Sequence, residues 1–376
     1  MKKSPKSLPM RVKITLTILG SLTFAIIIIA AALMMKWKKA DHLTAQMFRQ
    51  DATAEPLPMS VNTIDDESIP AGAADNNTIS GAISFNGKKY KYNDSLVNIL
   101  LLGTDDKGEY TDREAQQIVP YQTDTIVLGT IDAVKKEFSF LNIPRDTVTT
   151  LQVLDFNDEP AATEYGPIAT QHSYGSQGVK TNEATVSCVS NLLYGIPIYR
   201  YVIVSLEAVP AINSSVGGVT VEVLEDMTAW DSKLKVGKTV TLTDDEAVIY
   251  TCRRDVTVDD SAVGRMKRQT QYVTNLFPAA KSKTREDITF PIKLYNSLSD
   301  KVDTNLTLDE ITYLAKQLLD LNLNADSIET IPGQMREVSA DEFEGYNYKM
   351  GYVVDEEALK QLIIDRFYTE IETSQK

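Results

Sequence analysis

The stretch Val97-Asn98-Ile99-Leu100-Leu101-Leu102-Gly103, followed by Thr104 and Asp105, decides the fold of this chain. Its apolar side chains run almost without interruption, which predicts a short strand buried on both faces. Such strands are typical of α/β domains, in which helices cover both sides of a sheet. Asp105 is therefore predicted to lie at the C-terminal end of a buried strand.

Two more strands are predicted after a polar loop. Residues 125–131 form the first, and residues 137–143, closed by Pro144 and Arg145, form the second. The short connection 132–136 implies that these two strands are antiparallel. Asp124, at the start of one strand, should then lie beside Arg145, just past the end of its neighbour. Asp105 joins them if the first strand also runs antiparallel to the second.

The remaining elements are predicted from periodicity and turn signals. We expect a helix over 180–193, a strand over 201–206, a turn into a strand over 216–221, a strand over 245–250, a helix from 264 to about 277 before Pro278, and amphipathic helices over 308–321 and 356–372. Arg253 and Arg254 follow shortly after the predicted strand at 245–250.

An arginine-rich stretch stands out in an acidic chain of net charge −14. It runs from Cys252-Arg253-Arg254 to Gly264-Arg265-Met266-Lys267-Arg268-Gln269. Guanidinium forks match the geometry of phosphate groups, so this stretch predicts an anion site. Arg265, Arg268 and Gln269 share one face of the predicted helix. The alternative is an ordinary solvated helix face.

The N-terminal segment predicts a membrane anchor. Residues 14–35 carry no charged side chain and are long enough to cross a bilayer as a helix. A cleaved signal peptide is the rival interpretation, but the apolar run exceeds the usual length and lacks a convincing cleavage site. The distribution of Lys and Arg modestly favours a cytoplasmic N-terminus over residues 1–13, which places the rest outside the cytoplasm.

The chain is then predicted to continue in three parts. Residues 36–95 are interpreted as an extracytoplasmic spacer, 96–285 as the core of the domain, and 286–376 as its C-terminal helical part or a small appendage. All 52 acidic residues lie beyond residue 40, which argues against a nucleic acid as partner because a phosphate polymer needs a broad basic face.

The two cysteines and two histidines limit the chemistry. Two cysteines exclude a disulfide scaffold, although they leave open a single bond between Cys188 and Cys252. Two histidines argue against a histidine-rich zinc site. Arginines beside Cys252 predict a lowered thiol pKa and a higher reactivity than that of Cys188; an inert apolar filler is the alternative.

Asp105, Asp124 and Arg145 can carry chemistry if they converge with the second arginine group. Carboxylate oxygens suit a hard cation such as Mg²⁺, and guanidinium groups suit pyrophosphate. Phosphoryl transfer depends mainly on positioning and charge neutralisation, which such a set supplies. The alternative is that each Asp is a turn or cap residue and that Arg145 forms a surface ion pair.

Five motifs in order resemble those of the LytR-CpsA-Psr family. They are Asn98-Ile99-Leu100-Leu101-Leu102-Gly103-Thr104-Asp105, Thr123-Asp124-Thr125-Ile126, Asn142-Ile143-Pro144-Arg145-Asp146-Thr147, Val216-Gly217-Gly218-Val219, and Gly264-Arg265 with Arg268-Gln269. The resemblance implies a single LCP-type α/β domain, with a central mixed β-sheet flanked by helices, behind one N-terminal transmembrane helix. It also implies a groove for a polyprenyl chain.

The resemblance further implies an activity and roles for residues. Members transfer a glycopolymer, such as teichoic acid or capsular polysaccharide, from an undecaprenyl-pyrophosphate carrier to the peptidoglycan of Gram-positive bacteria. Asp105 and Asp124 would bind magnesium, with one of them as general base. The pyrophosphate would contact Arg145 and the second arginine group, namely Arg253, Arg254, Arg265, Arg268 and Gln269.

Two departures from the family pattern keep a second function open. Gln122 and Cys252 stand where the resemblance implies arginines. Fewer cations predict slower turnover, or a non-catalytic relative that binds polyprenyl pyrophosphate or organises partners in the envelope. An extracellular interaction module without a phosphate ligand is the third alternative.

Overall fold

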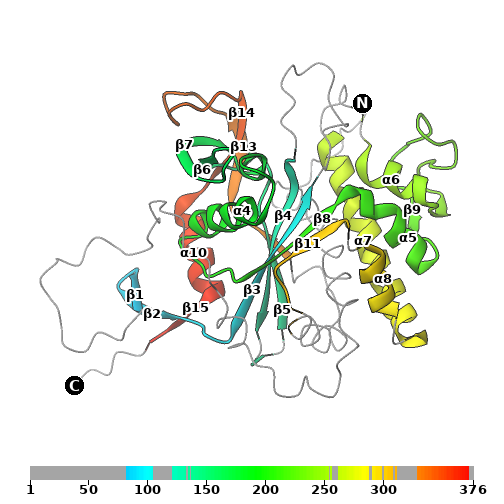
Figure 1. The fold of residues 1–376 in the computed structure, drawn as a ribbon, viewed down its shortest axis with the longest axis horizontal. Helices are drawn as coiled ribbons and strands as arrows, with labels where there is room; N and C mark the ends of the chain where they lie inside the picture. The colour runs from blue at the N-terminus through cyan, green and yellow to red at the C-terminus, as the bar shows by residue number, and fades with distance from the viewer. Residues whose placement is uncertain are drawn as a thin grey trace, which may run out of the picture.

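A six-stranded mixed sheet forms the centre of the protein (Figure 1). The computed structural model describes residues 82–104, 121–132, 134–135, 137–253, 255, 261–287, 290–298, 300–307, 310 and 328–371. The strand order is β11 (Val302–Thr304), β8 (Arg200–Ser205), β3 (Leu96–Thr104), β4 (Thr123–Asp132), β5 (Glu137–Asn142) and β12 (Ile328–Thr330). The predicted antiparallel pair β4–β5 is confirmed. Strand β3, whose direction the sequence left open, also runs antiparallel to β4, and β8 lies parallel to β3.

Strand β3 is buried on both faces, as predicted from its apolar run. Ile99 and Leu101 belong to the hydrophobic cluster on one face of the sheet, and Leu100 and Leu102 belong to the cluster on the other. This alternation follows from the two-residue repeat of a strand. Burying each of these leucines contributes roughly 1.5–3 kcal/mol, so β3 holds both layers to one sheet.

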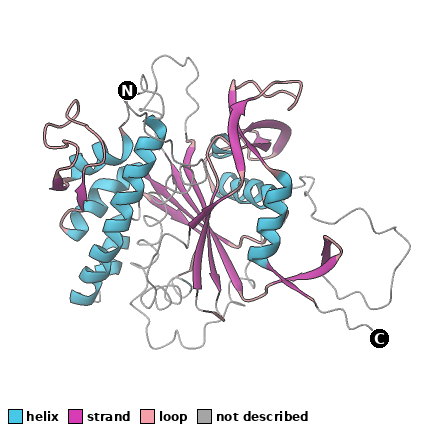
Figure 2. Ribbon diagram, turned by 180° about the vertical axis from the view of Figure 1, so that it is seen from behind, coloured by secondary structure: helices cyan, strands magenta, loops and turns pink. Residues whose placement is uncertain are grey.

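Helices cover the two faces of the sheet (Figure 2). One layer contains α5 (Val209–Val216), α6 (Asp244–Cys252), α7 (Ser261–Glu286) and α8 (Phe290–Leu298). The other contains α4 (Val179–Leu192), α10 (Glu356–Phe367), and the short helix η2 (Ile168–Ser173). The short helix η3 (Leu206–Ala208) leads into α5.

Four small sheets complete the described part of the chain. One has three strands, in which β2 (Lys88–Tyr92) lies between β1 (Ala82–Phe85) and β15 (Tyr368–Glu370). The other three pair β6 (Val148–Leu154) with β7 (Pro160–Pro167), β9 (Thr220–Glu222) with β10 (Thr239–Thr241), and β13 (Gly333–Glu337) with β14 (Met350–Val354). Phe85 on β1 is buried in the core. Folded elements therefore extend into the last part of the segment interpreted as a spacer.

Three predicted elements differ from the structure. Residues 245–250 lie in helix α6 and not in a strand, because Thr243 and Glu246 form a capping box that starts a helix. Helix α7 continues past Pro278 to Glu286, since Leu276 and Ala280 pack into the core on either side of it. At the C-terminus, α10 ends at Phe367 and the chain turns into β15.

The other predicted helices and strands in the described residues are present. Helix α4, strand β8 and strand β9 match the expected segments, and Gly217 ends α5 in the left-handed conformation that favours glycine. The predicted span 14–35 lies outside the described residues, as do nearly all residues of the predicted helix at 308–321. Within the part of the chain that is described, no helix combines the length and apolar character needed to cross a membrane.

A buried ion pair holds the start of strand β8, and its contribution to stability can be tested. Arg200 at the start of β8 donates two hydrogen bonds to one carboxylate oxygen of Glu310, and both side chains are buried. Arg200→Met should lower the free energy of unfolding by about 3–5 kcal/mol, because it leaves a buried carboxylate without its partner. Urea unfolding of the purified protein measures this change.

Arg336→Met is the matched control, because Arg336 pairs with Glu342 at the surface. It should change the free energy of unfolding by about 0–1 kcal/mol. The double variant Arg200→Met/Glu310→Met should recover part of the loss. Equal losses for Arg200→Met and Arg336→Met would contradict the assigned role of the buried pair.

Candidate functional site

The ends of three strands meet at one edge of the central sheet. Thr104 at the end of β3 pairs with Thr123 at the start of β4, and Ile143 after β5 donates its backbone N–H to Ile126. The antiparallel register brings the residues before β4 close to those after β5. This is the geometry that the sequence predicted for Asp124 and Arg145.

Arg145 is held by side chains from the start of β4. Its guanidinium forms an ion pair with the carboxylate of Asp124 and donates a hydrogen bond of 2.5 Å to Oε1 of Gln122. Its Nε lies 3.7 Å from the carboxylate of Asp146. The side chains of Arg145 and Asp124 are 31% and 22% exposed, so a ligand from solvent can reach both. Asp105 and Arg254 lie outside the described residues.

The backbone around Arg145 is fixed by elements distant in sequence. The backbone carbonyl of Arg145 accepts a hydrogen bond of 3.0 Å from Ala169 in η2, and that of Asp146 accepts one of 2.8 Å from Tyr352 in β14. The backbone N–H and the side-chain hydroxyl of Thr147 both donate hydrogen bonds to the carbonyl of Pro144. This turn therefore presents Arg145 from a backbone whose polar groups are satisfied.

Helix α7 uses Arg268 and Gln269 to hold the end of α6. The Nε of Arg268 donates to the carbonyl of Tyr250 at 2.7 Å, and another of its nitrogens donates to the carbonyl of Arg253. Gln269 donates to the carbonyl of Thr251 at 2.9 Å. The last carbonyls of a helix have no partners within that helix, so these side chains supply them.

Arg268 is fully buried and differs in this respect from the predicted pyrophosphate ligand. Its guanidinium also forms an ion pair with Glu225, and it lies 5.8 Å from the ring centroid of Tyr250. A buried guanidinium is costly unless it is paired, and here the protein supplies the partners. Arg268 therefore belongs to the scaffold of the site, in contrast to its predicted contact with ligand.

Gly264 leaves the space that Glu225 needs to reach Arg268. A Cβ atom at position 264 would lie 2.4 Å from a carboxylate oxygen of Glu225, which is too close for any real contact. Gly264 and Arg268 are one helical turn apart on α7, so they face the same way. The glycine of the Gly264-Arg265 motif is thus explained by close approach of a carboxylate.

Arg265 connects α7 with the turn that carries Arg145. Burial lowers the pKa of Arg265, while the nearby charges of Cys252 and Asp146 oppose that shift. Its guanidinium therefore lies within electrostatic reach of Asp146, the residue after Arg145. Arg253 is exposed at the C-cap of α6, beside Cys252. Arg265 thus borders the turn that carries Arg145.

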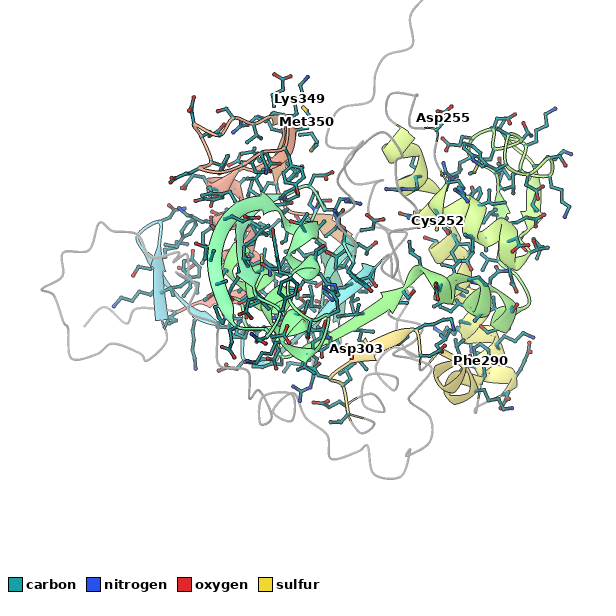
Figure 3. All side chains as sticks on the ribbon, turned by 45° about the horizontal axis from the view of Figure 1, so that its top comes forward. Cys252, Asp255, Phe290, Asp303, Lys349 and Met350 are labelled. Atoms are coloured by element: carbon teal, nitrogen blue, oxygen red, sulfur yellow. The ribbon has the colours of Figure 1, made fainter. Side chains whose placement is uncertain are left out.

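The two sides of the candidate site come from different layers of the fold. Figure 3 shows Cys252 and Asp255 in the layer built by α6 and α7, and Lys349 and Met350 at the end of the β13–β14 hairpin in the other layer. Strand β14 of this hairpin pairs at Tyr352 with Thr147, two residues after Arg145. The hairpin, distant in sequence, therefore contacts the turn that carries Arg145.

A model of the LytR_cpsA_psr family matches residues 62–363. The chain belongs to the LytR-CpsA-Psr family. The match extends beyond the five motifs, which run from Asn98 to Gln269, and it includes the β13–β14 hairpin and most of α10.

Individual relatives of this LytR-CpsA-Psr protein are distant. The polyisoprenyl-teichoic acid–peptidoglycan teichoic acid transferase TagU of Bacillus anthracis is 27% identical over 278 residues, which cover 74% of this chain and 80% of the relative. TagU of Bacillus cereus is 29% identical and covers 63% of this chain and 69% of the relative. The solved structure of protein gbs0355 from Streptococcus agalactiae shares the fold, with a TM-score of 0.52, 17% identity, and coverage of 75% and 92%.

Sequence reasoning missed several residues that border the site of this LytR-CpsA-Psr protein. Gln122 was noted only as a missing cation, whereas it accepts a hydrogen bond from Arg145. Tyr348 lies within electrostatic reach of Arg145, although it is on the distant β13–β14 loop. No local signal in the sequence marks Tyr348, because its electrostatic interaction with Arg145 depends on the pairing of the hairpin with Thr147.

The described residues fit a magnesium site only through Asp124. No cluster of three or more His, Cys, Asp or Glu suited to a metal lies among them, and Asp105 lies outside them. Mg²⁺ commonly takes one or two protein carboxylates and fills its other positions with water and phosphate oxygens. A partly exposed carboxylate at the edge of the sheet is therefore a suitable donor, although it is shared with Arg145.

Cys252 differs from its prediction in the direction of its pKa shift. Both cysteines are free, and burial raises the pKa of Cys252 above 9.0 even though Thr251, Arg265 and Arg253 act in the opposite direction. Complete burial raises the pKa of Cys188 to about 12. The expected lowering of the Cys252 pKa is thus wrong, because the loss of hydration outweighs the neighbouring charges.

Gly264→Ala should reduce the free energy of unfolding by about 1–3 kcal/mol, because the added methyl group displaces Glu225 from Arg268. At an exposed helix position Gly→Ala would raise the free energy of unfolding by roughly 0.5–1 kcal/mol. A decrease therefore indicates a steric clash, and an increase indicates free space. Urea unfolding measures it. In a Glu225→Ala background the cost of Gly264→Ala should disappear. An unchanged cost in that background would refute the close-approach explanation.

Alkylation of Cys252 should be slow near neutral pH and should accelerate as the pH rises past its ordinary pKa. A raised pKa keeps the thiol protonated below that pH, and only the thiolate reacts. Cys188 should react more slowly than Cys252 because it is fully buried. Mass spectrometry after iodoacetamide treatment from about pH 7 to about pH 10 tests both statements. The unfolded protein, in which both thiols react alike, is the control; a Cys252 rate already maximal at neutral pH contradicts the raised pKa.

Proposed function

We propose that this protein is a membrane-anchored phosphotransferase that moves a glycopolymer of the teichoic acid or capsule type from an undecaprenyl-pyrophosphate carrier to peptidoglycan. The observation that carries the proposal is the partly exposed pair of Asp124 and Arg145, with Arg265 in electrostatic reach of the same turn. The names of the TagU relatives from two Bacillus species support this class of reaction.

The arginines are suited to a pyrophosphate group. Arg145 presents a planar fork of donors that can bind phosphate oxygens in pairs. Burial disfavours the charged form of Arg265, so an anion placed beside it compensates for the hydration that the guanidinium has lost. Arg253 adds exposed positive charge at the end of α6. In this proposal Arg254 and Gln269 also contact the pyrophosphate.

The proposed reaction is a transfer between two oxygen atoms. The acceptor hydroxyl oxygen forms a bond to the phosphorus that carries the glycan, and the bond from that phosphorus to the bridging oxygen breaks. Polyprenyl phosphate leaves with the bridging oxygen. The proton of the hydroxyl passes to one of the two carboxylates, Asp105 or Asp124. The arginines hold the reacting groups in line and balance the negative charge.

Magnesium is the proposed cofactor, and Asp124 and Asp105 are its proposed ligands. When bound, the ion supplies positive charge beside the phosphate oxygens. Asp124 has to share its carboxylate between the ion and Arg145, and the hydrogen bond to Gln122 keeps Arg145 in place while it does so. The anchor at 14–35 is proposed to keep the reaction at the outer surface of the membrane, where the lipid carrier lies.

Gln122 gives this chain a neutral support for Arg145. Its Oε1 accepts a hydrogen bond of 2.5 Å, a role that a second guanidinium cannot fill because arginine has no acceptor. Cys252 is the other position where the resemblance implies arginine. Each charged hydrogen bond that is lost to the pyrophosphate removes about 1.5–3 kcal/mol, so we propose slower turnover than in a relative with both arginines.

Arg145→Ala and Asp124→Ala should each lower the transfer rate by about 10- to 100-fold, because each removes a charged contact to the reacting group. The assay uses the full-length protein in detergent, a polyprenyl-pyrophosphate glycan, Mg²⁺ and peptidoglycan fragments, and it follows the phosphate-linked product. Arg285→Ala is the matched control, because Arg285 is exposed at the far end of α7 from Arg265. It should leave the rate unchanged.

Two other outcomes would replace the proposal. Tight binding of the lipid pyrophosphate without product above the Arg145→Ala and Asp124→Ala backgrounds favours a non-catalytic binding protein. Absence of lipid binding contradicts both functions and leaves an interaction module. Chelation of divalent cations should abolish transfer, and full activity in excess chelator contradicts the metal assignment alone.

A further inference from the structure

The β13–β14 hairpin is hydrogen-bonded directly to the turn that carries Arg145. Tyr352 on β14 donates its N–H to the carbonyl of Asp146 at 2.8 Å and pairs with Thr147 in a parallel bridge. Gly351 fits there because a Cβ atom would lie 2.5 Å from Val148 and 2.7 Å from the hydroxyl of Tyr346. The loop 338–349 at the end of this hairpin is thus fixed relative to Arg145.

Aromatic side chains gather where this loop meets strand β7 and η2. We call them the aromatic surface: Tyr165, Tyr174, Phe343, Tyr346 and Tyr348. Tyr165 and Phe343 pack edge to face with ring centroids 5.3 Å apart, and Tyr346 and Tyr348 lie 5.5 Å apart. Tyr346 is buried and donates its hydroxyl to the carbonyl of Met350, so it supports the others. Tyr165 and Tyr348 remain exposed.

Carboxylates border the aromatic surface, and Arg145 lies at one side of it. Tyr174 donates its hydroxyl to Glu164. The charge of Glu164 acts on Tyr348 in one direction and that of Arg145 in the other, while Asp146 acts on Tyr346. Tyr348 is therefore within electrostatic reach of both Glu164 and the guanidinium of Arg145. Burial is the largest cause of the raised pKa of both tyrosines.

These groups match the chemistry of an uncharged saccharide. A pyranose ring has C–H faces that pack on aromatic rings and hydroxyls that donate to carboxylates and accept from phenols. A polyprenyl chain offers nothing for Glu164 or the phenol hydroxyls, and their burial beneath it would carry a desolvation penalty. A glycopolymer linked by phosphates is repelled by Glu164 and Asp146. Any donor glycan is also tied covalently to the pyrophosphate, which the proposed function places against Arg145 and α7, so the acceptor glycan is the saccharide that can approach from the β13–β14 side.

We propose that the aromatic surface is a saccharide subsite that binds the sugar rings of the acceptor glycan and directs one of its hydroxyls toward Arg145 and Asp124. This inference rests on the proposed transferase function and adds a place for the second substrate. Tyr348 stacks on a sugar ring, and Glu164 accepts hydrogen bonds from sugar hydroxyls. The pyrophosphate then lies against Arg145 and the α7 side, and the acceptor approaches from the β13–β14 side.

Direct binding of an uncharged probe tests the subsite without requiring turnover. The probe is the N-acetylglucosamine tetramer, titrated into full-length protein in detergent by calorimetry. Tyr348→Ala should weaken binding about five- to tenfold, and Tyr348→Phe, which keeps the ring, should stay near wild type. Glu164→Gln should weaken binding by a smaller factor.

Trp230→Ala is the matched control, because Trp230 is 38% exposed and Tyr348 is 39% exposed, but Trp230 lies beyond β9 in the other layer. It should leave probe binding unchanged. Three results overturn the proposal: no binding of the tetramer by wild type at millimolar concentration, equal losses for Tyr348→Phe and Tyr348→Ala, or a loss of affinity in Tyr348→Ala for a glycerol phosphate oligomer and not for the tetramer.

Kinetics separate this inference from the proposed function. At saturating lipid donor, Tyr348→Ala should raise the KM for the peptidoglycan acceptor about five- to tenfold and leave donor binding unchanged. Tetramer binding that depends on Tyr348, in a protein without transferase activity, overturns the proposed function and leaves the subsite standing. Transfer with an unchanged acceptor KM in Tyr348→Ala overturns the subsite alone.

Discussion

The rest of the structure depends on the burial of strand β3 on both faces. Because Ile99 and Leu101 pack into one layer while Leu100 and Leu102 pack into the other, neither layer can shift along the sheet without disturbing the other. Core packing of this kind is dense and resists small displacements. The end of β3 is therefore held rigidly by the core. Asp124, Arg145 and the turn around them lie next to this end of the strand.

The arginine-rich stretch performs two different tasks. Arg268 and Gln269 bind the carbonyls of Tyr250, Thr251 and Arg253 and so hold the C-terminal end of α6. Arg265, one helical turn from Gln269, extends toward Asp146. A contiguous charged motif thus contains residues that hold the scaffold and a residue that borders the candidate site. The complete burial of Arg268 marks its scaffold role, whereas its spacing along the helix does not.

The sequence predicted what depends on local pattern. Continuous apolar runs and the short connection 132–136 were sufficient to predict the strands β3, β4 and β5, to pair β4 with β5 and to bring Asp124 to Arg145. They left the direction of β3 open, and the structure pairs it with β4. The predicted strand over 245–250 is wrong because a short apolar stretch fits a strand as well as a helix. The capping box of Thr243 and Glu246 is the sequence signal that distinguishes the two. The burial of Arg268 was beyond prediction, since its partner Glu225 comes from a loop far away in the sequence.

The small sheet of β1, β2 and β15 joins the two ends of the described chain. Strand β2 pairs with β1 on one side and with β15 on the other, and Asn93 and Ile371 extend these contacts to Phe367 and Lys89. Mechanical load that enters from the N-terminal side reaches β1 first and passes through β2 to β15. The last strand of the described chain would therefore share the load applied to its first ones.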